Sequence, residues 1–586
     1  MLDKFCFRKF FQLRIREIFD RKTIDSYSVR CHNTLSLIKE MVEACNGWKL
    51  GNIKLKETIS VIFDELYDSL KVDKCIDLSI APIDVLKSIY DDFKSIKDAE
   101  SRYGVRTLQY FMQRLYDQNR ECYCSRLKEE IDEFLFSDNQ YHDEDFMPKM
   151  LEFDRLITSL ACEMINRGYS KSYLYFKAKN LCSAKDFETG YNEFVNKALT
   201  FNNNKYKVIL RLRIENCNDA KAGWPDTFKT DLPNGMYDEY LQTGKKYPTL
   251  KPLKGSYKFY IKDDVEALDI DGAILSVQND VWKDFDYLHI GMNALNVCIV
   301  SALVMYEVDG TKYAVDKPRR NNIYDIPYPN DFTNALNIQR VLNNIEVNHT
   351  ISEESVNRLL SSFRHIRIAN ESHEIEQQFI NYWIALEFLF SSPATNENTF
   401  KRTLDNIRNI LSACYVKRNI LVLTEELKRK KILDKDFCPV NMDKAQIESL
   451  IGERNLDVLL KYRLFYYKSM LCGHSDKKKE YINAHRKHIE YQIYRMYRLR
   501  NELVHEAAIK QNIERITCSL RYYLMFTLNQ MIGYFIKMKD ISNKPYSIDD
   551  FLSEYNIQYN KVFKSDSISD FMKGADITNY LLYIPN

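Results

Sequence analysis

The stretch from His488 to Lys510 reads HIEYQIYRMYRLRNELVHEAAIK and predicts a long amphipathic helix. Its apolar residues recur at intervals of three and four, which is the period of a helix with one buried face. The apolar stripe consists of Ile489, Ile493, Met496, Leu503, Val504 and Ala507. At about 100° per residue, Arg500 falls in the middle of this stripe, so the sequence predicts a helix that turns a guanidinium toward its own bundle.

An arginine in that position needs a partner, because a guanidinium cannot be neutralised and is costly to bury alone. We expect a carboxylate, a cleft that holds a substrate phosphate, or both, to face Arg500; the alternative is that its side chain extends to the edge of the bundle. On a straight helix His505 lies about 140° from Arg500. Either the helix breaks after Arg500 and Asn501 caps a new segment, or a second copy of the chain completes the site. Taken alone, His505 would be an ordinary surface or packing histidine.

The hydrophobic pattern predicts a mainly α protein in four parts. Residues 1–200 have apolar residues at helical spacing nearly throughout and predict an N-terminal helical array. Residues 201–331 predict a small central α/β segment, and residues 332–540 predict a C-terminal helical bundle. Residues 541–586 form a mixed tail with short helical pieces.

The central segment is distinguished by alternating, β-branched sequence. Lys205–Asn216 and Ser256–Lys262 read as strands, and the stretch around Val265–Leu288 reads as a helix. Further on, two apolar runs flank Asp309-Gly310, a residue pair that is typical of a two-residue hairpin turn.

Composition excludes several classes of protein. A chain of 586 residues with 45% hydrophobic and 28% charged residues is expected to form two or three globular domains. The formal net charge is +2, so any binding of nucleic acid must depend on a local basic patch. No stretch approaches the roughly 18 apolar residues that are needed to span a bilayer, so we expect no membrane contact.

The cysteine pattern bears on compartment and metal binding. The 14 cysteines are scattered and form no CxxC pair, which fits reduced thiols in a cytoplasmic protein better than a disulfide framework. Cys472, His474, His485 and His488 are close in sequence, but their spacing is not that of a zinc site. We therefore predict no metal site and no cofactor.

A local basic patch does precede Arg500. Between Asp476 and Arg500 there are eight basic and three acidic residues, with four tyrosines among them. Positive charge combined with rings that stack on bases suits single-stranded RNA, and the candidate RNA-binding residues are Arg486, Lys487, Arg495 and Arg498. The alternative is a solvated helix face whose tyrosines pack into the bundle.

Two segments of the C-terminal third resemble the hallmark helices of the HEPN domain family, in particular its ApeA-like branch of bacterial antiviral proteins. The segment QQFINYWIALEFLF (Gln377–Phe390) contains Trp383, Ala385, Leu386 and Glu387, which match a W-x-A-L-E helix of that branch. About a hundred residues later, Arg500, Asn501 and His505 match its R-N-x-x-x-H helix. The resemblance covers about residues 343–539.

This resemblance implies a metal-independent endoribonuclease that acts in antiviral (phage) defence. In such an enzyme His505 would exchange a proton, Arg500 would stabilise charge on the phosphoryl group, and Asn501 would position His505 or cap the local helix. We expect Glu387 to pair with Arg500, or otherwise with another basic residue such as Arg402 or Arg498. The expected partners are RNA, a second copy of the chain through the HEPN domain, and a phage-derived trigger. The alternative is a non-catalytic HEPN scaffold for dimerisation or RNA binding.

Overall fold

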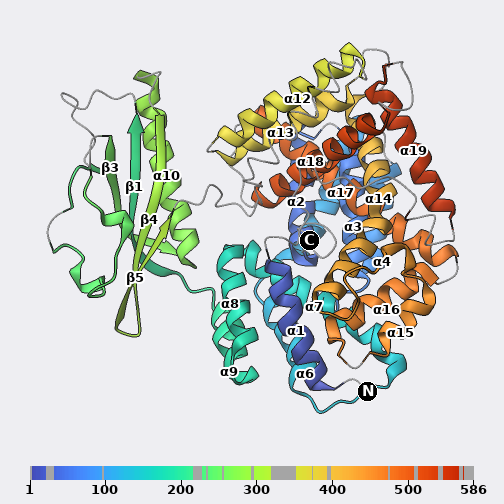
Figure 1. The fold of residues 1–586 in the computed structure, drawn as a ribbon, viewed down its shortest axis with the longest axis horizontal. Coiled ribbons are helices and arrows are strands. Elements are labelled where there is room, and N and C mark those ends of the chain that lie inside the picture. Colours follow the sequence, from blue (N-terminus) through green and yellow to red (C-terminus); the bar gives the residue numbers. More distant parts are fainter. Residues whose placement is uncertain are drawn as a thin grey trace. The chain divides into compact units, whose positions relative to one another are not determined.

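The computed structural model describes residues 3–20, 32–53, 55–95, 98–215, 227–232, 235–253, 256–291, 296–318, 339, 343, 351–372, 374–391, 398–453, 455–472, 475–506, 513–538, 545–565 and 572. It is mainly helical and contains one five-stranded antiparallel sheet in the middle of the sequence, so the predicted fold class is confirmed (Figure 1). The chain divides into two compact units, one of residues 1–162 with 326–586 and one of residues 163–325.

The sheet unit is built on four long strands and one short strand in the order β2-β3-β1-β4-β5. The strands are β1 (Asn204–Glu215), β2 (Phe228–Lys229), β3 (Tyr257–Ala267), β4 (Asn296–Val308) and β5 (Thr311–Pro318). The predicted hairpin is confirmed, because Asp309 and Gly310 join β4 to β5 with φ values of 49° and 75°. Both residues lie in the left-handed region that a tight two-residue turn requires.

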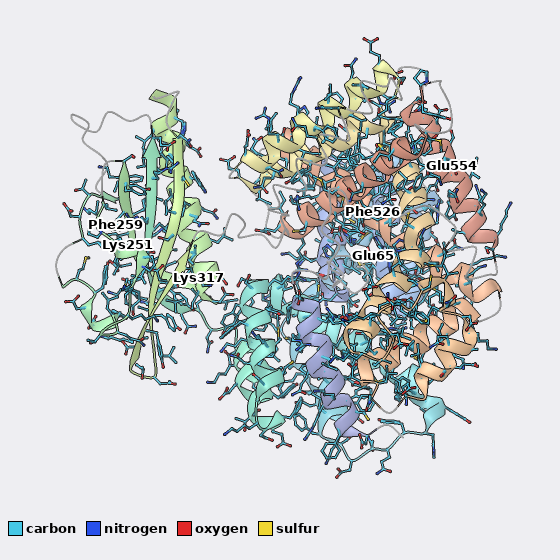
Figure 2. All side chains as sticks on the ribbon, in the orientation of Figure 1. Glu65, Lys251, Phe259, Lys317, Phe526 and Glu554 are labelled. Carbon is cyan, nitrogen blue, oxygen red and sulfur yellow. The ribbon has the colours of Figure 1, made fainter. Side chains whose placement is uncertain are left out.

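Each face of the sheet packs against a different layer. Helix α10 (Ile270–Gly291) covers the face that carries Val208 and Leu210. The segment 235–253, which contains the 3-10 turns η3 (Asp238–Tyr240) and η4 (Pro248–Leu250), covers the face that carries Ile209 and Phe259 (Figure 2). Alternate residues of β1 therefore enter two separate cores, as expected for a strand that is buried on both sides.

Residues 163–200 belong to the sheet unit, which differs from the predicted boundary at residue 200. They form α8 (Lys171–Ser183), α9 (Phe187–Tyr191) and the π-helical turn η2 (Asn192–Asn196). Asp269, buried just before α10, accepts hydrogen bonds from the backbone N–H and the hydroxyl of Ser170 at 2.7 and 3.0 Å. Burial raises the pKa of Asp269, and the hydrogen bonds from Gly272 and Ser170 oppose that rise. These hydrogen bonds thus fix the start of α8 to the segment just before α10.

The helical unit combines both ends of the chain (Figure 1). Its N-terminal helices are α1 (Lys4–Phe19), α2 (Thr34–Leu50), α3 (Lys56–Leu70), α4 (Ile83–Ser95), α5 (Asp98–Asn119), α6 (Tyr123–Phe136) and α7 (Phe146–Asn166). Its C-terminal helices are α12 (Glu353–Glu371), α13 (Ile375–Phe390), α14 (Thr399–Arg429), α15 (Lys444–Ile451), α16 (Val458–Cys472), α17 (Ser475–Glu506), α18 (Ile513–Met538) and α19 (Ile548–Lys564). Two short 3-10 turns, η1 (Asp143–Asp145) and η5 (Pro439–Asn441), complete the unit.

This arrangement does not match the predicted separation of residues 1–200 from residues 332–540. Helix α3 packs against α17, and α1 packs against α16, so the two ends of the chain share one compact unit. Periodicity shows that each helix has a buried face, but it does not show which distant helix covers that face. Helix α19, in the predicted tail, also packs on α14 and belongs to the same unit.

Candidate functional site on helix α17

Helix α17 carries Arg500, Asn501 and His505 and runs without interruption from Ser475 to Glu506. The alternative in which the helix breaks after Arg500 is therefore wrong, and Asn501 does not cap a new helix. On a continuous helix, positions 500 and 505 are separated by about 140° around the axis. The backbone of His505 lies within α17, and its side chain lies outside the described residues.

Arg500 is partly buried, and its Nη1 donates a hydrogen bond to the side-chain oxygen Oδ1 of Asn501 at 3.1 Å. Among the described side chains, no carboxylate pairs with Arg500. The predicted ion pair with Glu387 is therefore not formed. Glu387 is partly buried on α13 and has no ion pair with any described residue, whereas the alternative partners Arg402 and Arg498 bind other carboxylates.

The two helices on which the family resemblance is based pack against each other. Trp383 of α13 is fully buried, and its ring lies 6.2 Å from the ring of Tyr497 on α17, measured between centroids. Phe400 at the start of α14 lies 4.2 Å from the same tyrosine ring. Aromatic packing thus fixes α17 against α13 and α14 one turn before Arg500.

Arg495 was predicted to bind RNA, but the structure places it in the interior. Its side chain is 2% exposed. Its Nε lies 2.9 and 3.0 Å from the two carboxylate oxygens of Glu40 on α2, and its Nη2 donates to the same carboxylate at 2.8 Å. Arg495 also forms an ion pair with Glu65 on α3. The assignment of Arg495 to an RNA-binding surface is corrected for this conformation, because two carboxylates and the surrounding core cover it.

Arg498 takes part in the same cluster. Its side chain is 13% exposed, and its Nη2 lies 2.5 Å from the carboxylate of Glu40. His32, just before α2, places its Nε2 3.8 Å from Glu40. We call the five residues Glu40, Glu65, Arg495, Arg498 and His32 the Glu40 cluster.

Burial and charge within the Glu40 cluster shift the pKa of its members in different directions. Burial raises the pKa of Glu40, but the guanidiniums of Arg495 and Arg498 outweigh it and hold that pKa well below its usual range. Burial would lower the pKa of Arg495, whereas Glu40 and Glu65 raise it. Burial lowers the pKa of His32 to about 3, although Glu40 opposes this shift. The cluster therefore holds two arginines, two carboxylates and a neutral histidine.

Arg486 and Lys487, the other predicted RNA-binding residues, are in different surroundings. Arg486 donates from Nη1 to Asn409 Oδ1 at 2.7 Å, and its guanidinium lies 4.1 Å from the ring centroid of Tyr559. Burial lowers the pKa of Arg486. Lys487 is exposed. Of the four predicted RNA-binding residues, Lys487 is the one whose side chain lies at the surface of the described structure.

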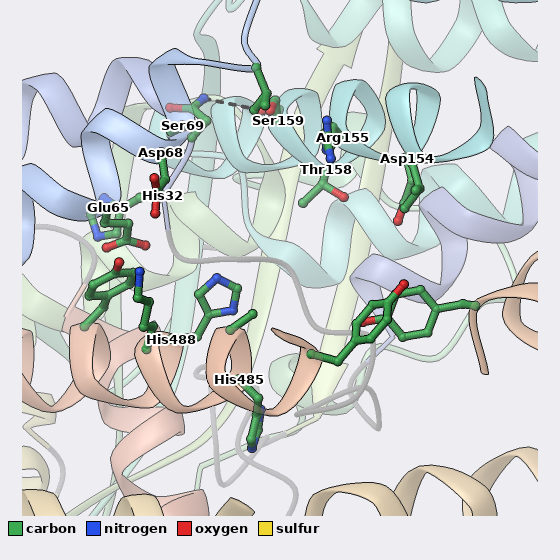
Figure 3. A pocket seen from close by; sticks show the side chains of 18 of the residues that line it. His32, Glu65, Asp68, Ser69, Asp154, Arg155, Thr158, Ser159, His485 and His488 are labelled. Carbon is green, nitrogen blue, oxygen red and sulfur yellow. Dashed lines mark hydrogen bonds between the residues drawn. The ribbon is translucent and has the colours of Figure 1, made fainter. Parts of the chain in front are cut away.

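A cavity of about 1190 Å³ lies between the N-terminal helices and α17. Glu65, Asp68 and Asp154 line it from the N-terminal helices, and His488 lines it from α17 on the opposite side (Figure 3). Arg463 of α16, which also lines the cavity, forms ion pairs with Glu17 and Glu426. The contact between the two ends of the chain thus combines ion pairs and a cavity with aromatic packing.

The sequence analysis missed Glu40, Glu65 and His32. One signal could have found the burial of Arg495: Tyr491, Arg495 and Leu499 recur at four-residue spacing and are all buried. They form a second buried stripe on α17, beside the one identified from Ile489 and its neighbours. Nothing in the local sequence identifies Glu40 as the partner, since 455 positions separate it from Arg495.

Within the described residues, no group of three or more histidines, cysteines, aspartates and glutamates is placed to hold a metal ion. His485 stacks on Tyr415 with ring centroids 3.9 Å apart, and burial holds its pKa well below its usual value. In the same part of the chain, no helix is long and apolar enough to cross a membrane. No protein-family model, no curated protein and no solved structure matches this chain.

Proposed function

We propose that this protein is a metal-independent endoribonuclease of the HEPN type that acts in antiviral (phage) defence. The observation that carries the proposal is the state of Arg500. It is partly buried beside Asn501, and no described carboxylate neutralises it. A partly desolvated guanidinium without a fixed anion attracts a phosphate more strongly than a fully hydrated one does.

The proposed reaction needs only protein side chains. The 2′-oxygen of a ribose attacks the adjacent phosphorus while its proton passes to a base, and the bond from phosphorus to the 5′-oxygen breaks as that oxygen gains a proton. The products are a 2′,3′-cyclic phosphate and a 5′-hydroxyl. His505 exchanges one of these protons, and Arg500 stabilises the charge that develops on the phosphoryl oxygens. Asn501 holds the guanidinium through its side-chain oxygen.

The proposed active site requires a second copy of the chain. Because α17 is continuous, positions 500 and 505 face directions about 140° apart, and one helix does not direct both side chains at one phosphate. In a homodimer, Arg500 of one copy and His505 of the other act on the same phosphodiester. We therefore expect activity to depend on protein concentration near the dimer dissociation constant.

Cleavage of a labelled single-stranded RNA in excess chelator tests the proposal. We expect the wild-type protein to cleave, and His505→Ala and Arg500→Ala to lose cleavage while they keep the wild-type circular dichroism spectrum. His142→Ala is the matched control, because His142 is an exposed histidine outside α17. An oligonucleotide with 2′-deoxyribose throughout should remain intact, since it lacks the nucleophile. Cleavage that requires a divalent metal, or that survives His505→Ala, contradicts the proposal.

The unbroken helix also favours a second candidate function, a non-catalytic scaffold that uses the bundle for dimerisation or RNA binding. In that case the divergence of positions 500 and 505 has no chemical consequence. A protein that dimerises and binds RNA, but does not cleave it at any concentration, supports the scaffold. Mixing Arg500→Ala with His505→Ala separates the two, because a shared site regains part of its activity in the mixed dimer and a scaffold gains none.

A further inference from the structure

The N-terminal and C-terminal helices of the helical unit have hydrophobic clusters of their own. One cluster consists of residues between Leu35 and Leu127, from the N-terminal helices. Another consists of residues between Val416 and Met572, from the C-terminal helices. Ionic clusters and a cavity of about 1190 Å³ lie between them. Ring contacts between Phe10 and Tyr462 and between Phe146 and Phe465 also join the two sets of helices. A contact that is polar in part is typical of parts that move relative to each other.

The Glu40 cluster is an ionic link across this contact. Glu40 binds both Arg495 and Arg498, and Glu65 adds a second carboxylate on Arg495. These carboxylates accept hydrogen bonds from the guanidiniums in the way that phosphate oxygens do. Nη1 of Arg495 and Nη1 of Arg498 are nevertheless buried without a hydrogen-bond partner. The carboxylates thus satisfy the two arginines only in part.

A buried ionic cluster of this kind contributes little net stability. Moving the charges out of water costs about as much as their attraction returns, and apolar residues of similar volume often stabilise a protein equally well. The cluster is therefore better suited to fixing one arrangement of the helices than to holding the fold together.

The contact covers a particular face of α17. At about 100° per residue, positions 498 and 505 lie within about 20° of each other, and position 495 lies about 80° from position 505. Position 500 faces elsewhere, about 160° from position 498. The N-terminal helices therefore bind the side of α17 on which position 505 lies, and no carboxylate of the described residues pairs with Arg500 on the other side.

We propose that α2 and α3 are a built-in inhibitor of α17. In the resting protein the carboxylates of Glu40 and Glu65 form ion pairs with Arg495 and Arg498. When the N-terminal helices separate from α17, these arginines bind the phosphates of an RNA strand that approaches position 505. The inference rests on the proposed function and specifies how its site is regulated. It also explains why Arg495 and Arg498, two of the four predicted RNA-binding residues, are covered in this conformation.

The experiment uses the full chain and the double variant Glu40→Gln/Glu65→Gln. Hydrogen exchange followed by mass spectrometry reports on the contact, and we expect exchange in residues 489–500 to accelerate about tenfold or more as the contact opens. Fluorescence anisotropy with a fluorescein-labelled single-stranded RNA measures the Kd for RNA, which should depend on whether the arginines are free to bind phosphates. If the released state is a minor population in the wild type, we expect Kd to fall by about 10- to 100-fold.

Two further variants keep the test independent of misfolding. Glu65→Gln alone removes one carboxylate and leaves Glu40 in place, so it should give smaller changes of the same sign. Adding Arg498→Gln to the double variant should reverse the gain in RNA affinity while the faster exchange remains. Glu152→Gln is the matched control, because Glu152 forms its ion pairs with Lys74 and Lys149 within the N-terminal helices.

The outcomes separate this inference from the proposed function. Faster exchange together with tighter RNA binding supports the inhibitor, whether or not any variant cleaves RNA. Unchanged exchange in Glu40→Gln/Glu65→Gln overturns it, and so does faster exchange without tighter RNA binding. The proposed function is judged by chelator-resistant cleavage and its loss in His505→Ala, which none of these binding measurements involves.

Discussion

Arg495 and Arg500 lie five residues apart on one helix, and their surroundings are opposite. Arg495 is buried between two carboxylates from α2 and α3. Arg500 is partly buried, and its described polar contact is with Asn501. Because five positions correspond to about 140° of rotation, the two guanidiniums face different neighbours. The difference shows that the direction in which a side chain leaves the helix, rather than its residue type, decides whether carboxylates of other helices pair with it.

The largest effect that we expect from this comparison is on stability. Arg495→Met should lower the free energy of unfolding by about 3–5 kcal/mol, since it removes a buried guanidinium from the ion pairs of two carboxylates and leaves the buried Glu40 with Arg498 alone. Arg500→Met should change it by no more than about 0.5 kcal/mol, because no described ion pair is lost. Urea denaturation of both variants measures the difference. Equal destabilisation by the two substitutions would contradict the contrast drawn between them.

The second effect is on RNA cleavage, where we expect substitution of Arg500 to matter more than substitution of Arg495. Arg500→Ala should slow RNA cleavage by about 10²–10³-fold, as expected for the loss of a group that stabilises transition-state charge. Single-turnover kinetics with saturating protein measures the chemical step. Arg500→Lys tests geometry, because a lysine keeps the charge but not the planar, forked donor arrangement. Full activity in Arg500→Ala would remove this residue from the proposed site.

The third effect concerns pH. Burial lowers the pKa of the partly buried His32 to about 3, so between pH 6.5 and 3 the unfolded chain binds a proton that the folded protein does not. The free energy of unfolding should therefore fall as the pH falls through this window. His32→Gln should flatten the dependence, most clearly between about pH 7 and 5, above the range in which unfolded carboxylates titrate. An unchanged slope in that variant would show that His32 titrates alike in both states.

The smallest effect is expected at Lys487, which is exposed. Lys487→Ala should change the free energy of unfolding by less than about 0.5 kcal/mol. If this lysine contacts a phosphate, the variant should bind single-stranded RNA a few-fold more weakly. The slope of the logarithm of the binding constant against the logarithm of the salt concentration should then decrease in magnitude by about one, which corresponds to one released counterion fewer. Anisotropy titrations at several salt concentrations measure both. An unaltered slope would place Lys487 outside the RNA path.

The sequence was informative wherever the decisive interactions are local. Strand β1 and the β4–β5 hairpin follow from alternation and from the Asp309-Gly310 turn, and both are confirmed. The helical character of α12, α13 and α17 follows from three- and four-residue spacing and is also confirmed. The surroundings of Arg500 were predicted only in part: its side chain is partly buried, but Glu387 is not its partner.

The sequence alone determined which segments are helices and strands and which residue types are available for chemistry, because these depend on periodicity and on neighbours a few positions away. Only the tertiary structure decided that Arg495 meets Glu40, which is 455 positions away, and that residues 1–162 belong to the same compact unit as α17. The reason is physical. Every amphipathic helix must bury its apolar face, but many faces are interchangeable to a first approximation, and the choice among them depends on packing and charge pairing over the whole chain.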